Sequence, residues 1–228
     1  MAFQPIIDAH EKKIYSHEAL VRGVNNESAW SIISQVKEDN LYQFDQACRV
    51  KAIELASRLN MDSYLNINFL PNAVYKPEAC IRTTMEACKE YNFPNSKVIL
   101  EVTEGEKVKD PVHMLNIFKK YRDIGLLTAI DDFGEGYSSL NLLAEFQPDF
   151  VKLDRKLISG IDSDEVKQKI VKAINQLSSD LGIKLEAEGV ETKGEFSCLL
   201  SIGVRYYQGY YFCKPVFEGL GEVDFSLW

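Results

Sequence analysis

Short apolar segments alternate with longer amphipathic segments along most of this chain. The apolar segments have the length of buried strands, and the amphipathic ones repeat apolar residues at helical spacing. This alternation predicts a parallel sheet covered by helices. The predicted later strands are SYLNINF, KVILE, LLTAID, FVKLD, IKLEAE and VRYYQ, and the predicted helices cover 28–36, 39–59, 78–91, 111–121, 140–146, 166–181 and 193–200.

The first two predicted strands, FQPII and KKIYSHEALVR, depart from this alternation. Only a hairpin-length turn separates them, whereas a parallel crossover needs a dozen residues or more. We therefore expect this pair to be antiparallel. Seven or eight strand–helix units favour closure, so the predicted fold is a modified TIM (β/α) barrel whose first strand runs against the rest. No linker or repeat divides the chain, which predicts a single domain over residues 1–228.

Composition narrows the functional classes. The chain of 228 residues is 46% hydrophobic and 26% charged, as in an ordinary globular protein. Its net charge of −8 argues against binding polymeric nucleic acid. No long apolar run or secretory leader is present, and five cysteines lack metal spacing. We expect a cytoplasmic protein with reduced thiols and no membrane association.

Acidic or amide side chains recur where the predicted strands end. In a barrel of this type the carboxyl ends of the strands form one ring, which carries the chemistry. Oxygen donors gathered on that ring indicate Mg²⁺ or Mn²⁺. The candidates with oxygen donors are Glu18, Asn68, Glu101, Asp131, Asp132, Asp154 and Glu188, and Lys152 lies two residues before Asp154.

The Asp131–Asp132 pair closes an apolar strand. Adjacent strand residues point to opposite faces, so the backbone must turn for both to face one site. Two neighbouring carboxylates raise each other's pKa unless a cation holds them, and one carboxylate can bridge two metal ions. Taken alone, the pair is also consistent with one aspartate that caps the N-terminus of a helix and one that lies on the surface. The other strand-end acids favour the metal site.

Other candidates follow from strand alternation. Glu18 and Arg22 share one face, which places a metal ligand beside a cation suited to phosphate. Asn66 and Asn68 share another face, and we favour Asn68, nearer the strand end, as the ligand. Lys152 interrupts an apolar strand, which is costly unless the ammonium meets negative charge.

Three further residues follow the strand ends. Glu104 and Glu191 each lie three residues after a strand-end glutamate and are predicted to support loops. Gln208 follows the last strand and could contact a base or phosphate. The histidines show no metal spacing, and nucleotide-cofactor, P-loop and serine-hydrolase motifs are absent from the sequence.

These residues resemble the EAL-domain family of cyclic di-GMP phosphodiesterases. The matching patterns occur in family order: FQPI, EALVR, NINF, EVTE, DDFGEGYSS, KLD, EGVE and QGY. The resemblance implies a modified (β/α)₈ barrel that hydrolyses the bacterial second messenger cyclic di-GMP to linear 5′-pGpG with two Mg²⁺ or Mn²⁺ ions.

The resemblance also implies residue roles. One metal would be held by Glu18, Asn68, Glu101 and Asp131, and the other by Asp131, Asp132 and Glu188. Lys152 resembles the residue that positions water or assists the leaving oxygen, and Glu188 also resembles a general base, so these catalytic roles stay open. The implied substrate contacts are Leu20, Arg22, Asp154 and Gln208, and the implied loop supports are Glu104 and Glu191.

Family members dimerise through a segment similar to residues 133–139, so a homodimer is expected. A sensor domain outside this chain is a second expected partner, although a standalone enzyme fits equally. Since no ligand position is missing, hydrolysis is favoured. The alternatives are a cyclic di-GMP receptor that does not hydrolyse it, and a barrel hydrolase for another phosphodiester.

Overall fold

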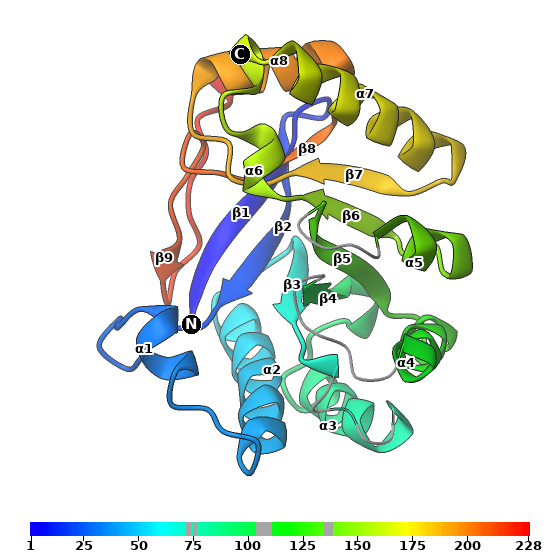
Figure 1. The fold of residues 1–228 in the computed structure, drawn as a ribbon. Coiled ribbons are helices and arrows are strands. Elements are labelled where there is room, and N and C mark those ends of the chain that lie inside the picture. Colours follow the sequence, from blue (N-terminus) through cyan, green and yellow to red (C-terminus); the bar gives the residue numbers. More distant parts are fainter. Residues whose placement is uncertain (72–73, 75–76, 104–110, 135–138) are drawn as a thin grey trace.

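A closed barrel of eight strands forms the centre of the molecule (Figure 1). The computed structural model describes residues 1–71, 74, 77–103, 111–134 and 139–228. The strands are β1 (Ala2–Asp8), β2 (Lys13–Leu20), β3 (Tyr64–Asn68), β4 (Val98–Thr103), β5 (Leu127–Phe133), β6 (Phe150–Leu153), β7 (Lys184–Ala187) and β8 (Tyr206–Tyr207), and a further short strand, β9 (Val216–Phe217), pairs with the beginning of β1.

The reversed first strand is confirmed. Strands β2 to β8 pair in parallel order, whereas β1 is antiparallel to both β2 and β8 and closes the barrel. The short turn after β1 leaves no room for a crossover, which dictates this direction. Gln4 pairs with Glu18, so the beginning of β1 lies at the edge where the other strands end.

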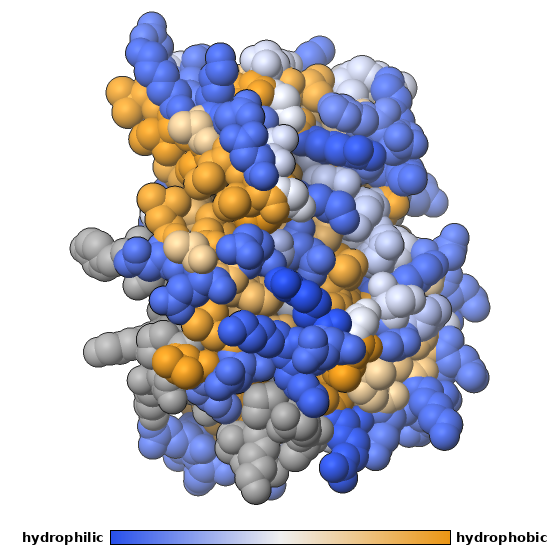
Figure 2. Space-filling model, turned by 90° about the vertical axis from the view of Figure 1, so that its right-hand side faces the viewer, coloured by the Kyte–Doolittle hydropathy of each residue, from blue (hydrophilic) through white to orange (hydrophobic). Residues whose placement is uncertain are grey.

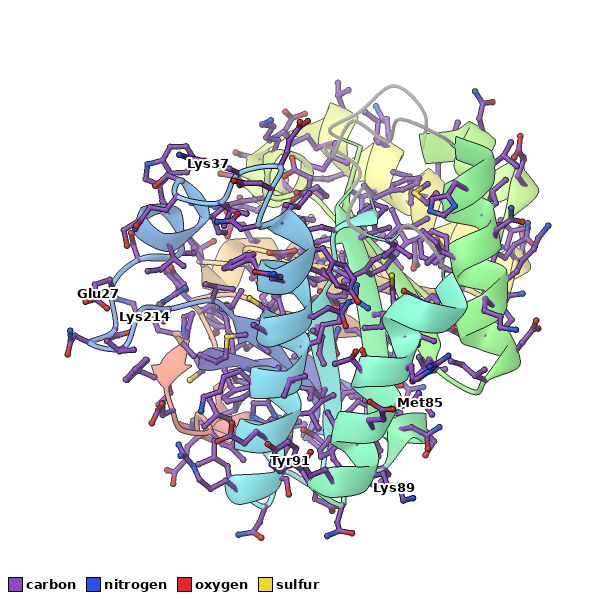
Figure 3. All side chains as sticks on the ribbon, turned by 90° about the horizontal axis from the view of Figure 1, so that it is seen from below. Glu27, Lys37, Met85, Lys89, Tyr91 and Lys214 are labelled. Carbon is purple, nitrogen blue, oxygen red and sulfur yellow. The ribbon has the colours of Figure 1, made fainter. Side chains whose placement is uncertain are left out.

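Helices cover the outside of the barrel (Figure 1). They are α1 (Ala29–Ile33), α2 (Leu41–Arg58), α3 (Pro77–Glu90), α4 (Pro111–Asp123), α5 (Ser139–Glu145), α6 (Arg155–Ile158), α7 (Glu165–Asp180) and α8 (Lys193–Ile202), with 3₁₀ turns η2 (Asn95–Lys97), η3 (Ile161–Ser163) and η4 (Phe225–Leu227). Figure 3 shows α2, α3 and α4 side by side, with Met85 and Lys89 marking α3. Among the described residues, no helix has the length and apolarity to cross a membrane.

The barrel interior has two layers. The lower layer is apolar and consists of Ile6, Ile99, Ala129, Phe150 and Tyr206. Side chains two positions along a strand share a face, so the neighbouring layer, toward the edge where β2 to β8 end, comes from the same strands. It contains Gln4, Glu101, Asp131, Lys152 and Gln208, all buried. The apolar layer therefore forms a floor beneath a polar layer.

Strand β9 and the segment that follows it were not predicted. Strand β9 pairs with Ala2 and Phe3 of β1. Beyond it, the ring of Trp228 packs edge-on against Phe196 of α8 and Phe212. The pairing with β9 holds the beginning of β1, which carries Gln4 into the polar layer.

We expect Asp8→Asn to lower the free energy of unfolding by about 1–3 kcal/mol. Buried Asp8 accepts hydrogen bonds from Arg205 at 2.6–3.0 Å and from the backbone N–H groups of His10 and Glu11. Burial acts to raise the pKa of Asp8, but these donors outweigh it and lower the pKa. The stabilisation that ionised Asp8 gives the folded state is therefore complete above the pKa that Asp8 has in the unfolded state. It is lost as the pH falls through the lower pKa of Asp8 in the folded state.

Urea unfolding at neutral pH measures this difference. Glu11→Gln is the matched control, because exposed Glu11 lies 3.7 Å from the same guanidinium. Equal losses in the two variants would contradict the assignment.

Candidate active site

The buried ammonium of Lys152 lies at the centre of the polar layer. Strand β6 carries it into the interior, where its Nζ lies 3.5 Å from Glu18, 3.3 Å from Glu101, 3.3 Å from Asp131 and 3.2 Å from Glu188. Burial alone would lower the pKa of Lys152, but the surrounding carboxylates, Asp131 foremost, raise it well above its ordinary value. Lys152 therefore carries a positive charge at neutral pH.

The carboxylates around Lys152 outnumber the positive charge. Burial raises the pKa of Glu101 well above its ordinary value, although Lys152 opposes the shift. The pKa of Glu188 is raised for the same reason, and Asp131 adds to it. Carboxylates held together in this way favour the binding of further positive charge.

The backbone turns at Asp132, as the double aspartate predicts. Asp132 has a φ of 53°, and the pairing of β5 with β6 shifts register between Ile130 and Phe133. A left-handed backbone is costly for a residue other than glycine and is often found at functional sites. The turn lets Asp131 and Asp132 both offer oxygens to one group with Glu188.

Two sets of three carboxylates fit divalent cations. Oxygens of Glu18, Glu101 and Asp131 lie within 4.8 Å of one another, and so do oxygens of Asp131, Asp132 and Glu188. Asp131 belongs to both sets. Hard oxygen donors are the ligands that Mg²⁺ and Mn²⁺ prefer, and a shared carboxylate is suited to a two-metal site.

Neutral amides orient two of these carboxylates. Asn68 donates to Glu18 Oε1 at 2.8 Å, so the structure brings this predicted ligand to the first set. Asn66 donates to Glu101 Oε1. Asn66, which the sequence did not favour as the ligand, therefore orients a carboxylate of the first set.

Gln208 also contacts the first set rather than facing solvent. It is buried and donates from Nε2 to Glu18 Oε2 at 2.7 Å. The same Nε2 lies 3.5 Å from Gln4 Oε1, and Gln4 donates to the carbonyl of Cys213. Gln208 thus positions Glu18 in this structure, and its predicted contact with substrate stays a prediction.

Sequence reasoning missed Glu186 and Gln4. Glu186 lies two residues before Glu188 on the same face of β7 and pairs in register with Lys152. Burial raises the pKa of Glu186 to about 8. Glu188 was selected by its place at a strand end; strand alternation puts Glu186 on the same face and could have found it. Gln4 could have been found as the polar residue that interrupts the apolar strand β1.

The remaining predicted substrate contacts are Leu20, Arg22 and Asp154. Leu20 is the last residue of β2. Arg22 donates to the carbonyl of Val21 and lines a pocket with Phe44 and Lys51, which contains none of the clustered carboxylates. The arrangement therefore does not show the predicted pairing of Arg22 with Glu18. Asp154 caps α6 by accepting from the backbone of Lys156 at 2.9 Å.

Of the two predicted loop supports, Glu191 lies within the described residues and Glu104 does not. Glu191 lies 2.7 Å from Arg155, which links the loop after β7 to α6. This contact is what a loop support would make. Glu104 lies outside the described residues, as does most of the segment 133–139 that was predicted to mediate dimerisation.

Fold and site together define a modified barrel with a carboxylate-rich catalytic edge. The family model of the EAL domain matches residues 1–215, and the chain belongs to this family. Among its relatives in Escherichia coli, the blue light- and temperature-regulated antirepressor BluF is 29% identical over 97% of this chain and 55% of its own length. The probable cyclic di-GMP phosphodiesterase PdeG is 32% identical over 71% of this chain and 32% of its own length.

Two solved structures are also similar. A standalone versatile EAL protein from Vibrio cholerae, in its c-di-GMP bound form, has 56% identity and a TM-score of 0.96 over 99% of this chain and 96% of its own. A manganese/cy-diGMP complex of BlrP1 from Klebsiella pneumoniae has 35% identity and a TM-score of 0.92 over 97% of this chain and 57% of its own. The chain thus spans about half or less of the length of the two Escherichia coli relatives but nearly the whole length of the Vibrio protein.

We expect Mn²⁺ to raise the melting temperature of this protein and Asp131→Asn to remove most of the effect, because Asp131 belongs to both carboxylate sets. A ligand at about 100 times its Kd stabilises the folded state by about 2.7 kcal/mol. Thermal unfolding with and without the ion measures the shift. Asp123→Asn, at an exposed aspartate of α4, should respond like the wild type. An undiminished shift in Asp131→Asn would exclude the proposed ligand set.

Proposed function

We propose that this protein hydrolyses cyclic di-GMP to linear 5′-pGpG and so lowers a second-messenger signal. The observation that carries the proposal is the pair of carboxylate sets that share Asp131 beside the ammonium of Lys152. Support also comes from relatives named cyclic di-GMP phosphodiesterases and from similar structures that contain c-di-GMP. The five free cysteines are consistent with a reducing compartment, the cytoplasm.

Two Mg²⁺ or Mn²⁺ ions fit the carboxylate sets. Glu18, Asn68, Glu101 and Asp131 would hold one ion, and Asp131, Asp132 and Glu188 the other. When bound, such ions polarise the phosphoryl oxygens and lower the pKa of a water molecule. A manganese complex of a similar protein supports this choice.

The chemistry requires one bond to form and one to break. Water oxygen bonds to phosphorus, the bond from phosphorus to the 3′ oxygen breaks, and that oxygen takes up a proton. Lys152 keeps its proton at Nζ because of the surrounding carboxylates, so it can donate a hydrogen bond to the attacking water or to the departing oxygen. We propose that Glu188, whose side chain is about one-third exposed, accepts a proton from the attacking water.

A second function, cyclic di-GMP recognition without hydrolysis, is favoured by one comparison. BluF, a relative over 97% of this chain, carries the name of an antirepressor. Both functions predict binding of the dinucleotide. Only hydrolysis predicts metal-dependent formation of the linear product.

We expect the wild type to form linear pGpG from cyclic di-GMP with Mn²⁺, and Lys152→Met to reduce kcat by about 10²- to 10⁴-fold, the usual range for a group that transfers or orients a proton. Chromatography of the nucleotide products measures the rate. Lys169→Met, which alters an exposed pair on α7, is the control. Binding without any product in the wild type would instead establish the receptor function.

We further propose that the protein forms a homodimer through the region around residues 133–139. Leu140, which follows this segment at the start of α5, is 63% exposed, and Val166 and Ile170 of α7 are also exposed. Figure 2 shows the side of the molecule on which α5 and α7 lie in Figure 1, and apolar areas occur there beside polar ones. Exposed apolar area of this kind often marks an interface.

Leu140→Glu should shift a dimer toward monomer, because the charge would be desolvated at the interface. Light scattering over a range of concentrations measures the mass. Val24→Glu changes a 90% exposed apolar residue in the loop after β2 and should leave the mass unchanged. A monomeric wild type at all concentrations would refute the dimer.

A further inference from the structure

A buried ion pair on α2 belongs to neither carboxylate set. Nη2 of Arg49 is 2.5 Å from Oδ2 of Asp45, and both side chains are at most 1% exposed. Burial raises the pKa of Asp45, and Arg49 opposes that shift. Removing two charges from water is costly, and an apolar pair of similar volume often stabilises a fold as well or better. The contacts of this pair therefore indicate what it contributes besides stability.

Both partners contact the segment that directly follows Asn68. The backbone N–H of Leu70 donates to Oδ1 of Asp45 at 2.9 Å. The guanidinium carbon of Arg49 lies 5.4 Å from the ring centroid of Phe69, within the range of a cation–π contact. The pair on α2 therefore holds the two residues after a predicted metal ligand, one by its backbone and the other by its ring.

Phe69 is also held by the barrel and by α4. Its backbone N–H donates to the carbonyl of Glu101 at 2.9 Å, which continues the pairing of β3 with β4 by one residue. Its buried ring packs edge-on against Phe118 and Tyr121 of α4, with 6.1 and 5.6 Å between ring centroids. These contacts leave Phe69 one position, against which the guanidinium of Arg49 packs.

We infer that Asp45, held by Arg49, is a positioning residue that directs the amide of Asn68 toward the first carboxylate set. The inference rests on the proposed metal site and adds a residue that acts behind one of its ligands. Asn68 is the last residue of β3 and donates to Glu18 Oε1 at 2.8 Å. Because the strand ends at Asn68, the path of the backbone beyond it sets the direction of this side chain. Asp45 fixes that path at Leu70.

The carboxylate of Asp45 makes contacts that an apolar side chain could not. Oδ1 accepts from the backbone N–H of Leu70, whereas Oδ2 accepts from Arg49 and from Nε2 of Gln46 at 3.2 Å. The loss of such an acceptor leaves a buried donor without its partner. Groups that orient a metal ligand from behind typically change metal affinity about 10- to 100-fold when they are altered.

The test measures the Kd for Mn²⁺ by calorimetric titration in a double-mutant cycle of Asp45→Asn and Asn68→Ala. Asp45→Asn preserves the size of the side chain but replaces one of its two acceptor oxygens with a donor. It should raise the Kd about 10- to 100-fold. In the Asn68→Ala background the same change should raise the Kd by less than about twofold, because the side chain that Asp45 directs is absent. An equal rise in both backgrounds, or no rise in either, would overturn the inference.

Asp8→Asn is the matched control. Asp8 is also a buried carboxylate paired with an arginine, Arg205, but it pairs along β1 with Tyr206 of the apolar floor. This variant should lose stability and keep the Kd of the wild type. A comparable rise in its Kd would refute the role of Asp45, because lower stability alone would then account for weaker binding.

A second measurement reads the position of Asn68 without metal. The side-chain amide signals of Asn68 in NMR spectra, assigned from their loss in Asn68→Ala, should shift in Asp45→Asn and stay in place in Asp8→Asn. If the wild type binds no Mn²⁺, the proposed metal site fails separately, and these signals decide on Asp45. Unchanged signals in Asp45→Asn would show that Asp45 does not position Asn68.

Discussion

The charge balance around Lys152 is the constraint on which the rest of this structure depends. Four carboxylates from different strands can approach one another inside the barrel only because an ammonium lies among them. The single positive charge of Lys152 cannot neutralise all four carboxylates. The pKa values of Glu101 and Glu188 are raised, as expected where positive charge is deficient. Divalent cations would remove this deficit. The arrangement that costs folding energy is therefore the same one that attracts metal.

The two-residue period of the strands connects the core to the site. Ile99 and Glu101, or Phe150 and Lys152, are successive inward-facing residues of one strand, and the first of each pair packs in the floor. A one-residue slip in register would carry both side chains out of the interior. Packing of the apolar floor therefore fixes the strand register, and with it the position and direction of the polar side chains in the next layer. In this way the hydrophobic core determines the geometry of the carboxylate cluster.

Most of the fold and much of the site could be predicted from the sequence, and the reasons are physical. Strand alternation and the rule that strand ends form one ring predicted that Glu18, Asp131 and Lys152 would meet. Contacts between side chains from distant strands carry no local signal, so the bond from Gln208 to Glu18 was not foreseen. Strand β9 was missed because two residues have no measurable period. The pair of Arg155 and Glu191 joins two loops, whose geometry no periodic pattern describes.

The apolar floor has a consequence for traffic through the barrel. Ile6, Phe150 and Tyr206 fill the lower end of the barrel, so a ligand of the carboxylate sets would enter and leave at the opposite end, where β2 to β8 end. Substrate and product would then use the same end of the barrel. A spent molecule that lingers there delays the next arrival, so the rate of clearance through this end sets an upper bound on how fast the barrel can be reused.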